Sequence, residues 1–124
     1  MDKKYFLADP DLARALQSVS NLIDQRIQIN NPDLQQALRQ MASNGGKYLR
    51  PAFCLLFAKI VNPTNWSSKR LIKVAASLEV LHMATLIHDD VIDDSPERRG
   101  AVSIQAAFGK DTAVYSGDLL FTVF

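Results

Sequence analysis

Apolar residues recur at intervals of three and four along most of the chain, a spacing that gathers them on one face of an α-helix. The first series runs through Leu12, Leu16, Val19, Leu22, Ile23 and Ile27. No segment alternates convincingly between apolar and polar residues, and residues 101–104 are too few to predict a strand. The pattern therefore predicts an all-α protein built as a helical bundle.

Proline and glycine divide this pattern, because proline begins a helix but cannot continue one, and glycine accepts the left-handed backbone of a helix end. The breaks are Asn30-Asn31-Pro32, Ser43-Asn44-Gly45-Gly46 and Asn62-Pro63. We predict helices over residues 12–30, 33–42, 51–61 and 67–92, a short helix over 103–109, and a last helix that Asp111 caps and that still runs at Phe124. The apolar run 119–124 carries no stop signal, so we expect further chain or a covering partner.

Composition narrows the class of protein. Hydrophobic residues make up 48% and charged residues 22% of the 124 residues, which is typical of a folded globular chain. The net charge of +1 gives no support to a nucleic-acid partner or a polybasic membrane anchor. The longest mostly apolar stretch, residues 74–87, is shorter than a bilayer span, so no transmembrane segment is expected. We expect a soluble, cytoplasmic protein.

Acidic residues cluster at the end of the longest predicted helix, in His88-Asp89-Asp90-Val91-Ile92-Asp93-Asp94. Asp89 and Asp93 are one turn apart, so their carboxylates and that of Asp90 can be directed at one place. Such a cluster is unfavourable where the helix dipole is also negative, and it favours a hard cation such as Mg²⁺. A solvated acidic helix end is the alternative interpretation.

A polar stripe leads back along the same helix from this cluster. Glu79, His82, Thr85 and Asp89 share one side of a segment that is otherwise apolar. Polar groups on a mostly buried helix are costly unless they face a polar cavity or find partners. His82 is therefore either a ligand-facing residue or a hydrogen-bonded core histidine.

Basic residues accompany glycine in two further segments. In Gly45-Gly46-Lys47-Tyr48-Leu49-Arg50-Pro51, Lys47 and Arg50 are three apart at a helix N-terminus, where phosphate binds favourably. In Arg98-Arg99-Gly100, the adjacent arginines point in different directions and can hold two phosphate groups. The alternatives are a helix cap with solvated cations and a loop that balances the acidic cluster.

Taken together, these motifs resemble the trans-isoprenyl (polyprenyl) diphosphate synthases. In order, the chain carries Gly-Gly-Lys-x-x-Arg-Pro, a helix ending in His-x5-His-Asp-Asp-x-x-Asp, Arg-Arg-Gly, and Gly117-Asp118-Leu119-Leu120. The resemblance covers residues 45–124, and the earlier residues fit only as helices. It implies that residues 1–124 are a single-domain fragment, the N-terminal helices of a larger isoprenoid synthase domain.

The resemblance also implies an activity and its residues. The enzyme would be a prenyltransferase that condenses isopentenyl diphosphate with an allylic diphosphate, usually as a homodimer. Mg²⁺ bridged to the allylic diphosphate would be bound by Asp89, Asp90 and Asp93, with Arg98 on the same diphosphate. The residues that would hold isopentenyl diphosphate are Lys47, Arg50, His82 and Arg99, with Gly46 allowing close backbone approach.

Product length is expected to depend on Ala84 and Thr85, about one turn before the first aspartate, where the family lines the pocket for the growing tail. Both residues are small, so the resemblance implies a medium- or long-chain product of the hepta- or octaprenyl type.

The family's second aspartate-rich motif does not occur in residues 1–124, so we expect one wall of an active site and no activity from this chain alone. Two alternatives stay open, a non-catalytic helical subunit of a heteromeric prenyl synthase and a fragment of a helical terpene cyclase. The four basic residues favour the synthase over the cyclase, because only the synthase holds a second diphosphate: Lys47, Arg50, Arg98 and Arg99.

Overall fold

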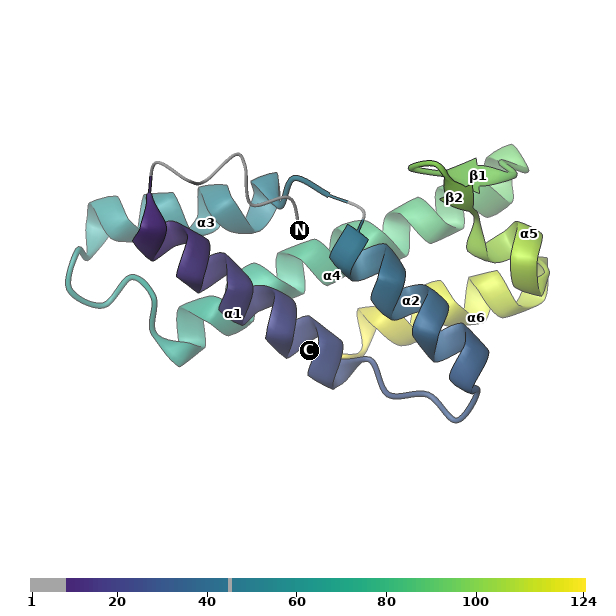
Figure 1. Ribbon diagram of the computed structural model, residues 1–124, viewed down its shortest axis with the longest axis horizontal. Coiled ribbons are helices and arrows are strands. Elements are labelled where there is room, and N and C mark those ends of the chain that lie inside the picture. Colours follow the sequence, from purple (N-terminus) through teal and green to yellow (C-terminus); the bar gives the residue numbers. More distant parts are fainter. Residues whose placement is uncertain (1–8, 45) are drawn as a thin grey trace.

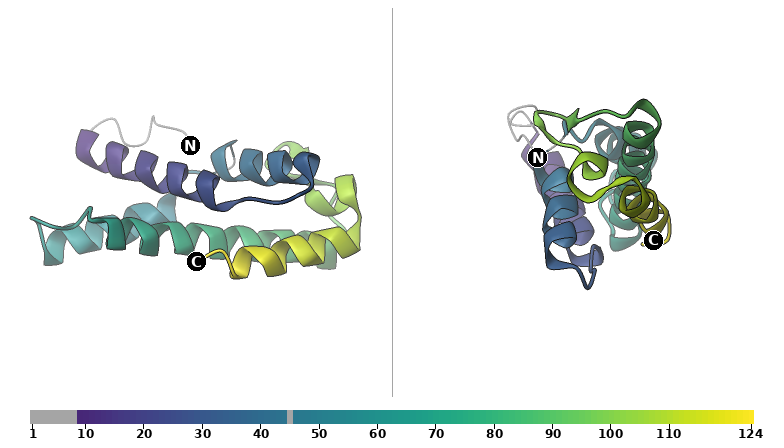
Figure 2. Two further views of the ribbon diagram at one scale, coloured as in Figure 1. Left: turned by 90° about the horizontal axis from the view of Figure 1, so that it is seen from below. Right: turned by 90° about the vertical axis from the view of Figure 1, so that its right-hand side faces the viewer.

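Helices form two packed layers in a computed structural model of the chain, which describes residues 9–44 and 46–124 (Figure 1). The elements are α1 (Pro10–Arg26), α2 (Pro32–Asn44), α3 (Leu49–Val61), α4 (Lys69–Asp93), β1 (Glu97–Arg98), β2 (Ala101–Val102), α5 (Ile104–Phe108) and α6 (Lys110–Phe121). One layer holds α1 and α2 end to end, and the other holds α3, α4 and α6 (Figure 2). The predicted all-α class is confirmed.

Local capping explains where several helices begin. The Asp9 carboxylate accepts a hydrogen bond from the Leu12 backbone N–H at 3.1 Å, and Pro10 occupies the first helical position of α1. Ser68 and Ser103 cap α4 and α5 in the same way. The predicted break after residue 43 also holds, because α2 ends at Asn44; Gly45 lies outside the described residues.

Both predicted bounds of the last helix are wrong. Gly109, with φ +91°, ends α5 and accepts a hydrogen bond from the Ala113 N–H at 3.1 Å, so it takes the capping position. Asp111 lies instead in the first turn, where its charge complements the helix dipole. At the other end, the Thr122 hydroxyl and backbone N–H both donate to the Leu119 carbonyl and close α6 at Phe121.

The hairpin that β1 and β2 form was not predicted from the sequence. Each strand has only two paired residues, too few to leave an alternating pattern. Glu97 pairs with Val102 and Arg98 with Ala101, which leaves Arg99-Gly100 as a two-residue turn. Both turn residues have positive φ, +54° and +79°, as a type I′ hairpin turn requires. Gly100 adopts this backbone without steric cost, whereas Arg99 must be held in it by its surroundings.

The central element is α4, which packs against α1, α3 and α6. Its length and apolar composition alone would allow it to cross a membrane. It is, however, packed between other helices, and its buried residues include Glu79 and Asp90. The remaining buried side chains are apolar: Ile72, Ala75, Ala76, Val80, Met83, Ala84 and Ile87. In all, 44% of the most apolar stretch of α4 is buried against the neighbouring helices.

Close packing of α6 on α4 depends on a glycine. A Cβ at Gly117 would overlap the His88 imidazole, whose Nε2 lies 3.1 Å from the Val114 carbonyl oxygen and 3.3 Å from an Asp118 carboxylate oxygen. The imidazole also packs at a tilt against Phe121, with 5.6 Å between ring centroids. Gly117 thus lets α6 approach the turn of α4 that precedes the acidic cluster.

We expect Gly117→Ala to lower the free energy of unfolding by about 1–3 kcal/mol, the usual cost of overpacking a core. The measurement is unfolding in urea, monitored by the far-ultraviolet circular dichroism signal. In a His88→Ala background the same change should cost little or stabilise, because alanine is the better helix former by about 1 kcal/mol. An equal loss in both backgrounds would contradict this account of Gly117.

Candidate functional site

One face of α4 carries the polar residues that the sequence singled out. Glu79, His82, Asp89 and Asp93 follow one another at helical spacings, with Leu86 between them. His82 is half-buried, and Asp89 and Asp93 are exposed. Asp89 lies seven positions after His82, which is about 10 Å along the helix axis. The face therefore holds two groups, one near the middle of α4 and one at its C-terminal end.

The first group lines an open pocket of about 280 Å³ where the start of α3, the middle of α4 and the hairpin turn meet. The lining residues are Gly46, Lys47, Tyr48, Leu49, Arg50, Glu79, His82 and Arg99. All five residues predicted for isopentenyl diphosphate are among them, although they come from three separate segments. We call these eight residues the cationic pocket.

Tyr48 anchors the loop that forms one side of the cationic pocket. Its backbone is left-handed, with φ 54°, which costs a non-glycine residue about 1–2 kcal/mol. Its side chain is buried, and its hydroxyl donates a hydrogen bond to the Ala42 carbonyl of α2 at 2.8 Å. α3 begins at Leu49, two residues earlier than predicted, so Arg50 lies in its first turn.

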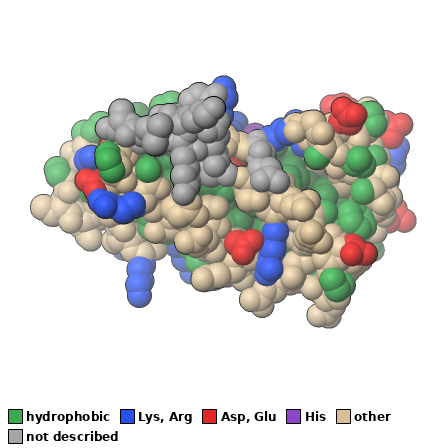
Figure 3. All heavy atoms as spheres, in the orientation of Figure 1, with side chains coloured by type: hydrophobic (Ala, Val, Ile, Leu, Met, Phe, Trp, Pro, Cys, Tyr) green, Lys and Arg blue, Asp and Glu red, His purple; other side chains and the backbone are tan. Residues whose placement is uncertain are grey.

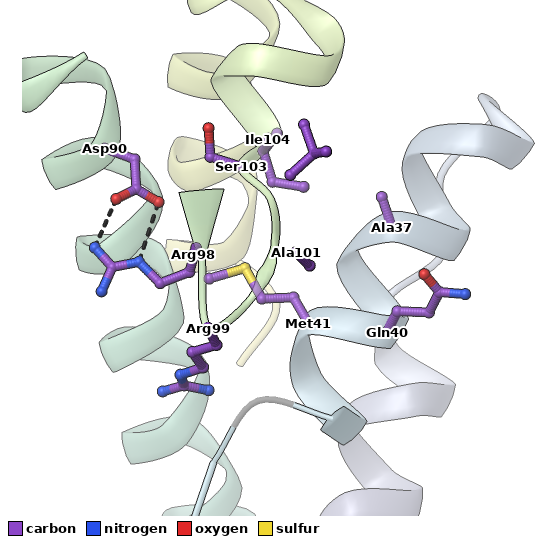
Figure 4. A pocket seen from close by; sticks show the side chains of 10 residues that line it. Ala37, Gln40, Met41, Asp90, Arg98, Arg99, Ala101, Ser103 and Ile104 are labelled. Carbon is purple, nitrogen blue, oxygen red and sulfur yellow. Dashed lines mark hydrogen bonds and ion pairs between the residues drawn. The ribbon is translucent and has the colours of Figure 1, made fainter. Parts of the chain in front are cut away.

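The hairpin sends its two arginines to different places (Figure 4). Arg98, in β1, donates to both Asp90 oxygens, with distances of 3.1 Å from Nε to Oδ2 and 2.6 Å from Nη2 to Oδ1. Arg99, in the turn, points away from Asp90 and lies against Gly46, where a Cβ would come within 3.2 Å of its Nη1. The hydrogen bonds that Arg98 donates to Asp90 raise the pKa of Arg98, so this side chain stays cationic.

Asp90 does not join Asp89 and Asp93. Its side chain is buried and both of its oxygens face Arg98. Among the described residues, no three His, Cys, Asp or Glu side chains are placed to hold one metal ion. The predicted convergence of all three carboxylates is therefore absent among the described residues, and metal binding by Asp89, Asp90 and Asp93 stays a prediction.

The two predicted chain-length residues face different ways. Ala84 is fully buried in the core, whereas Thr85 is exposed and its hydroxyl donates to the His82 carbonyl at 2.7 Å.

Arg98 and Arg99 also border a small hollow of about 130 Å³ between α2 and the hairpin, with Ala37, Met41 and Val102 among its apolar lining. Hydrophobic side chains gather over this region in Figure 3.

Electrostatics distinguish the cationic pocket from the acidic end. Burial lowers the pKa of His82, and the positive charges of Arg50, Arg99 and Arg98 lower it further, against a small opposing effect of Asp89. Burial raises the pKa of Glu79, and Arg99 and Arg50 oppose this. His82 is consequently a neutral hydrogen-bonding group near pH 7. Sequence reasoning noticed Glu79 but gave it no role, because its arginine partners lie far from it in the chain.

We expect an NMR titration to give His82 a pKa below its ordinary value of about 6.5. Because the folded pKa is lower than the unfolded one, the unfolded chain binds this proton more readily, and stability falls as pH drops through about 6.5. Saturating inorganic pyrophosphate should raise the His82 pKa by offsetting the arginine charges. The sequence has two histidines, so a His88→Gln variant assigns the signals. A His82 pKa at or above 6.5 would contradict this electrostatic picture.

Known proteins match the chain in sequence and in structure. The polyprenyl synthetase family model matches residues 31–124. Heptaprenyl diphosphate synthase component 2 of Geobacillus stearothermophilus is 40% identical over 116 residues, which are 94% of this chain and 34% of that protein. The chain spans about a third of the length of the curated relatives it matches.

Solved structures agree. Geranylgeranyl pyrophosphate synthase from Lactobacillus brevis ATCC 367 superposes with a TM-score of 0.88 at 36% identity, over 98% of this chain and 37% of that one. A polyprenyl synthase from Caulobacter crescentus CB15, solved in complex with calcium and isoprenyl diphosphate, gives a TM-score of 0.78 at 35% identity, over 90% and 34%. The chain therefore belongs to the polyprenyl synthetase family and has the all-α fold of its structures.

Proposed function

We propose that this chain forms one wall of the active site of a prenyltransferase that condenses isopentenyl diphosphate with an allylic diphosphate to give a polyprenyl diphosphate. The observation that carries the proposal is the pairing of a cationic pocket with an exposed acidic helix end on one face of α4. The matched relatives are about three times as long, and we propose that residues 1–124 are the N-terminal helices of a larger synthase domain.

The cationic pocket suits the diphosphate of isopentenyl diphosphate. Lys47 and Arg50 are exposed beside the half-buried His82, so charged and neutral donors face one space. Charge-assisted hydrogen bonds from arginine and lysine are the strong ones for phosphate oxygens. Gly46 leaves the backbone bare where Arg99 approaches.

The acidic end suits the allylic diphosphate with Mg²⁺. Mg²⁺ is usually held by one or two carboxylates together with substrate phosphates, and Asp89 and Asp93 are two exposed carboxylates one turn apart. The Caulobacter relative was solved with calcium and isoprenyl diphosphate, which supports a divalent cation. When bound, Mg²⁺ would neutralise charge that develops on the departing diphosphate. Asp90 would instead hold Arg98, as it does in the structure.

In this reaction the protein would mainly bind the two substrates and orient them. The allylic carbon–oxygen bond breaks, the double bond of isopentenyl diphosphate attacks the resulting cation, and the departing diphosphate takes the proton that is lost. Arg98 would add a fixed positive charge where negative charge grows, which is the largest usual contribution of a protein to such steps. The two sites on α4 would hold both substrates in register.

Two rival functions fit less well. A terpene cyclase needs a single diphosphate site, and the separate cationic pocket favours a second one. A purely structural subunit needs neither group of residues.

We further propose a cytoplasmic homodimer. Exposed apolar side chains on α6, such as Tyr115, Leu119 and Phe121, support the dimer.

We expect the chain to bind farnesyl diphosphate in a Mg²⁺-dependent manner by isothermal titration calorimetry, and Asp89→Asn to weaken that binding at least about tenfold, or 1.4 kcal/mol. Asp94→Asn is the matched control, because Asp94 is exposed at the same helix end and forms an ion pair with Lys110 at 3.4 Å. Equal losses in both variants, or no binding by a chain that is helical, would contradict the proposed allylic site.

We expect Thr85→Phe to weaken binding of geranylgeranyl diphosphate more than that of geranyl diphosphate, because the exposed ring would obstruct the longer tail. Thr85→Val, of nearly equal size, should leave the ratio of the two dissociation constants unchanged. Ala84→Phe should instead lower stability by about 1–3 kcal/mol, because Ala84 is fully buried. An unchanged ratio in Thr85→Phe would argue that the tail does not pass this residue.

A further inference from the structure

A buried carboxylate lies in the wall of the cationic pocket. Glu79 is 3% exposed, and it lines the pocket together with Lys47, Arg50 and Arg99. An acid is unexpected here, because its charge repels a diphosphate. Nothing in the proposed chemistry uses it. Its presence therefore needs a reason other than ligand contact.

Gly46 lies beside both Glu79 and Arg99. A Cβ at Gly46 would lie 3.2 Å from Arg99 Nη1, 3.6 Å from Arg99 Nη2 and 3.6 Å from Glu79 Oε1. The guanidinium and the carboxylate thus both border Gly46, and their opposite charges attract without a direct hydrogen bond or ion pair between the two side chains in the described part of the chain. A buried carboxyl group is costly without a cationic neighbour, and Arg99 is the first and Arg50 the second that lowers the cost.

Arg99 needs such a partner to keep one orientation. It is an exposed residue on a two-residue turn, with a left-handed backbone and a long flexible side chain. The neighbouring arginine shows a closer version of this arrangement, since Arg98 donates hydrogen bonds to both oxygens of the buried Asp90. Glu79 and Asp90 are eleven residues apart on α4, which is close to three full turns, so they share one side of the helix.

We propose that Glu79 is a positioning residue of the cationic pocket, whose carboxylate holds the Arg99 guanidinium over Gly46 in the orientation that receives a diphosphate. The inference rests on the proposed function, because that function gives the pocket its ligand. A pre-oriented arginine loses less conformational freedom when the ligand binds. The positioning gain and the repulsion from the carboxylate have opposite signs, so the direction of a mutational effect distinguishes them.

The test measures binding of inorganic pyrophosphate to the full chain by calorimetry. Glu79→Gln removes the charge and keeps the shape of the side chain. It also lessens the cost of burial, so the fold should persist, which circular dichroism checks. We expect pyrophosphate to bind Glu79→Gln at least about tenfold more weakly than the wild type, and Glu79→Asp to recover part of the affinity.

Glu97→Gln is the matched control, because Glu97 is exposed on β1 and is the other glutamate of the sequence. Its affinity should stay within about twofold, or rise slightly, because it removes a negative charge.

The double variant decides whether Glu79 acts through Arg99. In an Arg99→Gln background, Glu79→Gln should no longer weaken pyrophosphate binding. Without Arg99 the Glu79 carboxylate only repels pyrophosphate, and the substitution removes that repulsion. Equal or tighter binding by the single Glu79→Gln variant would overturn the proposal. A loss that persists in the Arg99→Gln background would overturn it too.

A second measurement needs no ligand. The pKa of the Glu79 carboxyl, followed by side-chain NMR, should rise in Arg99→Gln because the neighbouring positive charge is gone. An unchanged pKa would overturn the positioning role. If the folded wild type binds no pyrophosphate, the proposed function of the pocket fails, and the pKa comparison still decides whether Arg99 is held by Glu79.

Discussion

The two carboxyl groups buried on α4, those of Glu79 and Asp90, are the constraint on which the site depends. Removing a charge from water costs several kcal/mol unless a partner compensates it. These groups lie on one side of the helix, about 16 Å apart along its axis. Adjacent residues of a hairpin project in different directions, so Arg98 reaches Asp90 while Arg99 reaches the neighbourhood of Glu79. The Arg98–Asp90 ion pair fixes the hairpin against α4, and the charge of Arg99 lowers the cost of burying Glu79.

Once the hairpin is fixed, the same helix presents two places of opposite charge. The middle of α4 faces Arg50 and Arg99, where burial and then these positive charges lower the pKa of His82. Its C-terminal end exposes Asp89 and Asp93. A bare anion suits the first place, and an anion that brings its own cation suits the second. Under the proposed function, this contrast would keep two diphosphates apart on one surface.

Two glycines set the distances at which these parts meet. Gly117 leaves room for His88 between α4 and α6, and Gly46 leaves room for Arg99 beside Glu79. In each case a Cβ would push against the polar end of a side chain from another element. The glycines of the sequence motifs thus serve contacts inside the protein, in addition to any approach of a ligand.

The sequence by itself determined the helices and most of their ends, because apolar spacing, proline, glycine and capping side chains act over a few residues. Its resemblance to a family also named five of the residues that line the cationic pocket: Gly46, Lys47, Arg50, His82 and Arg99. Only the tertiary structure decided that Asp90 turns to Arg98 and away from Asp89 and Asp93. It also decided that Ala84 is buried while Thr85 is exposed, and that Glu79 borders the pocket. These outcomes depend on which distant segment packs against each turn of α4, and local sequence does not carry that information.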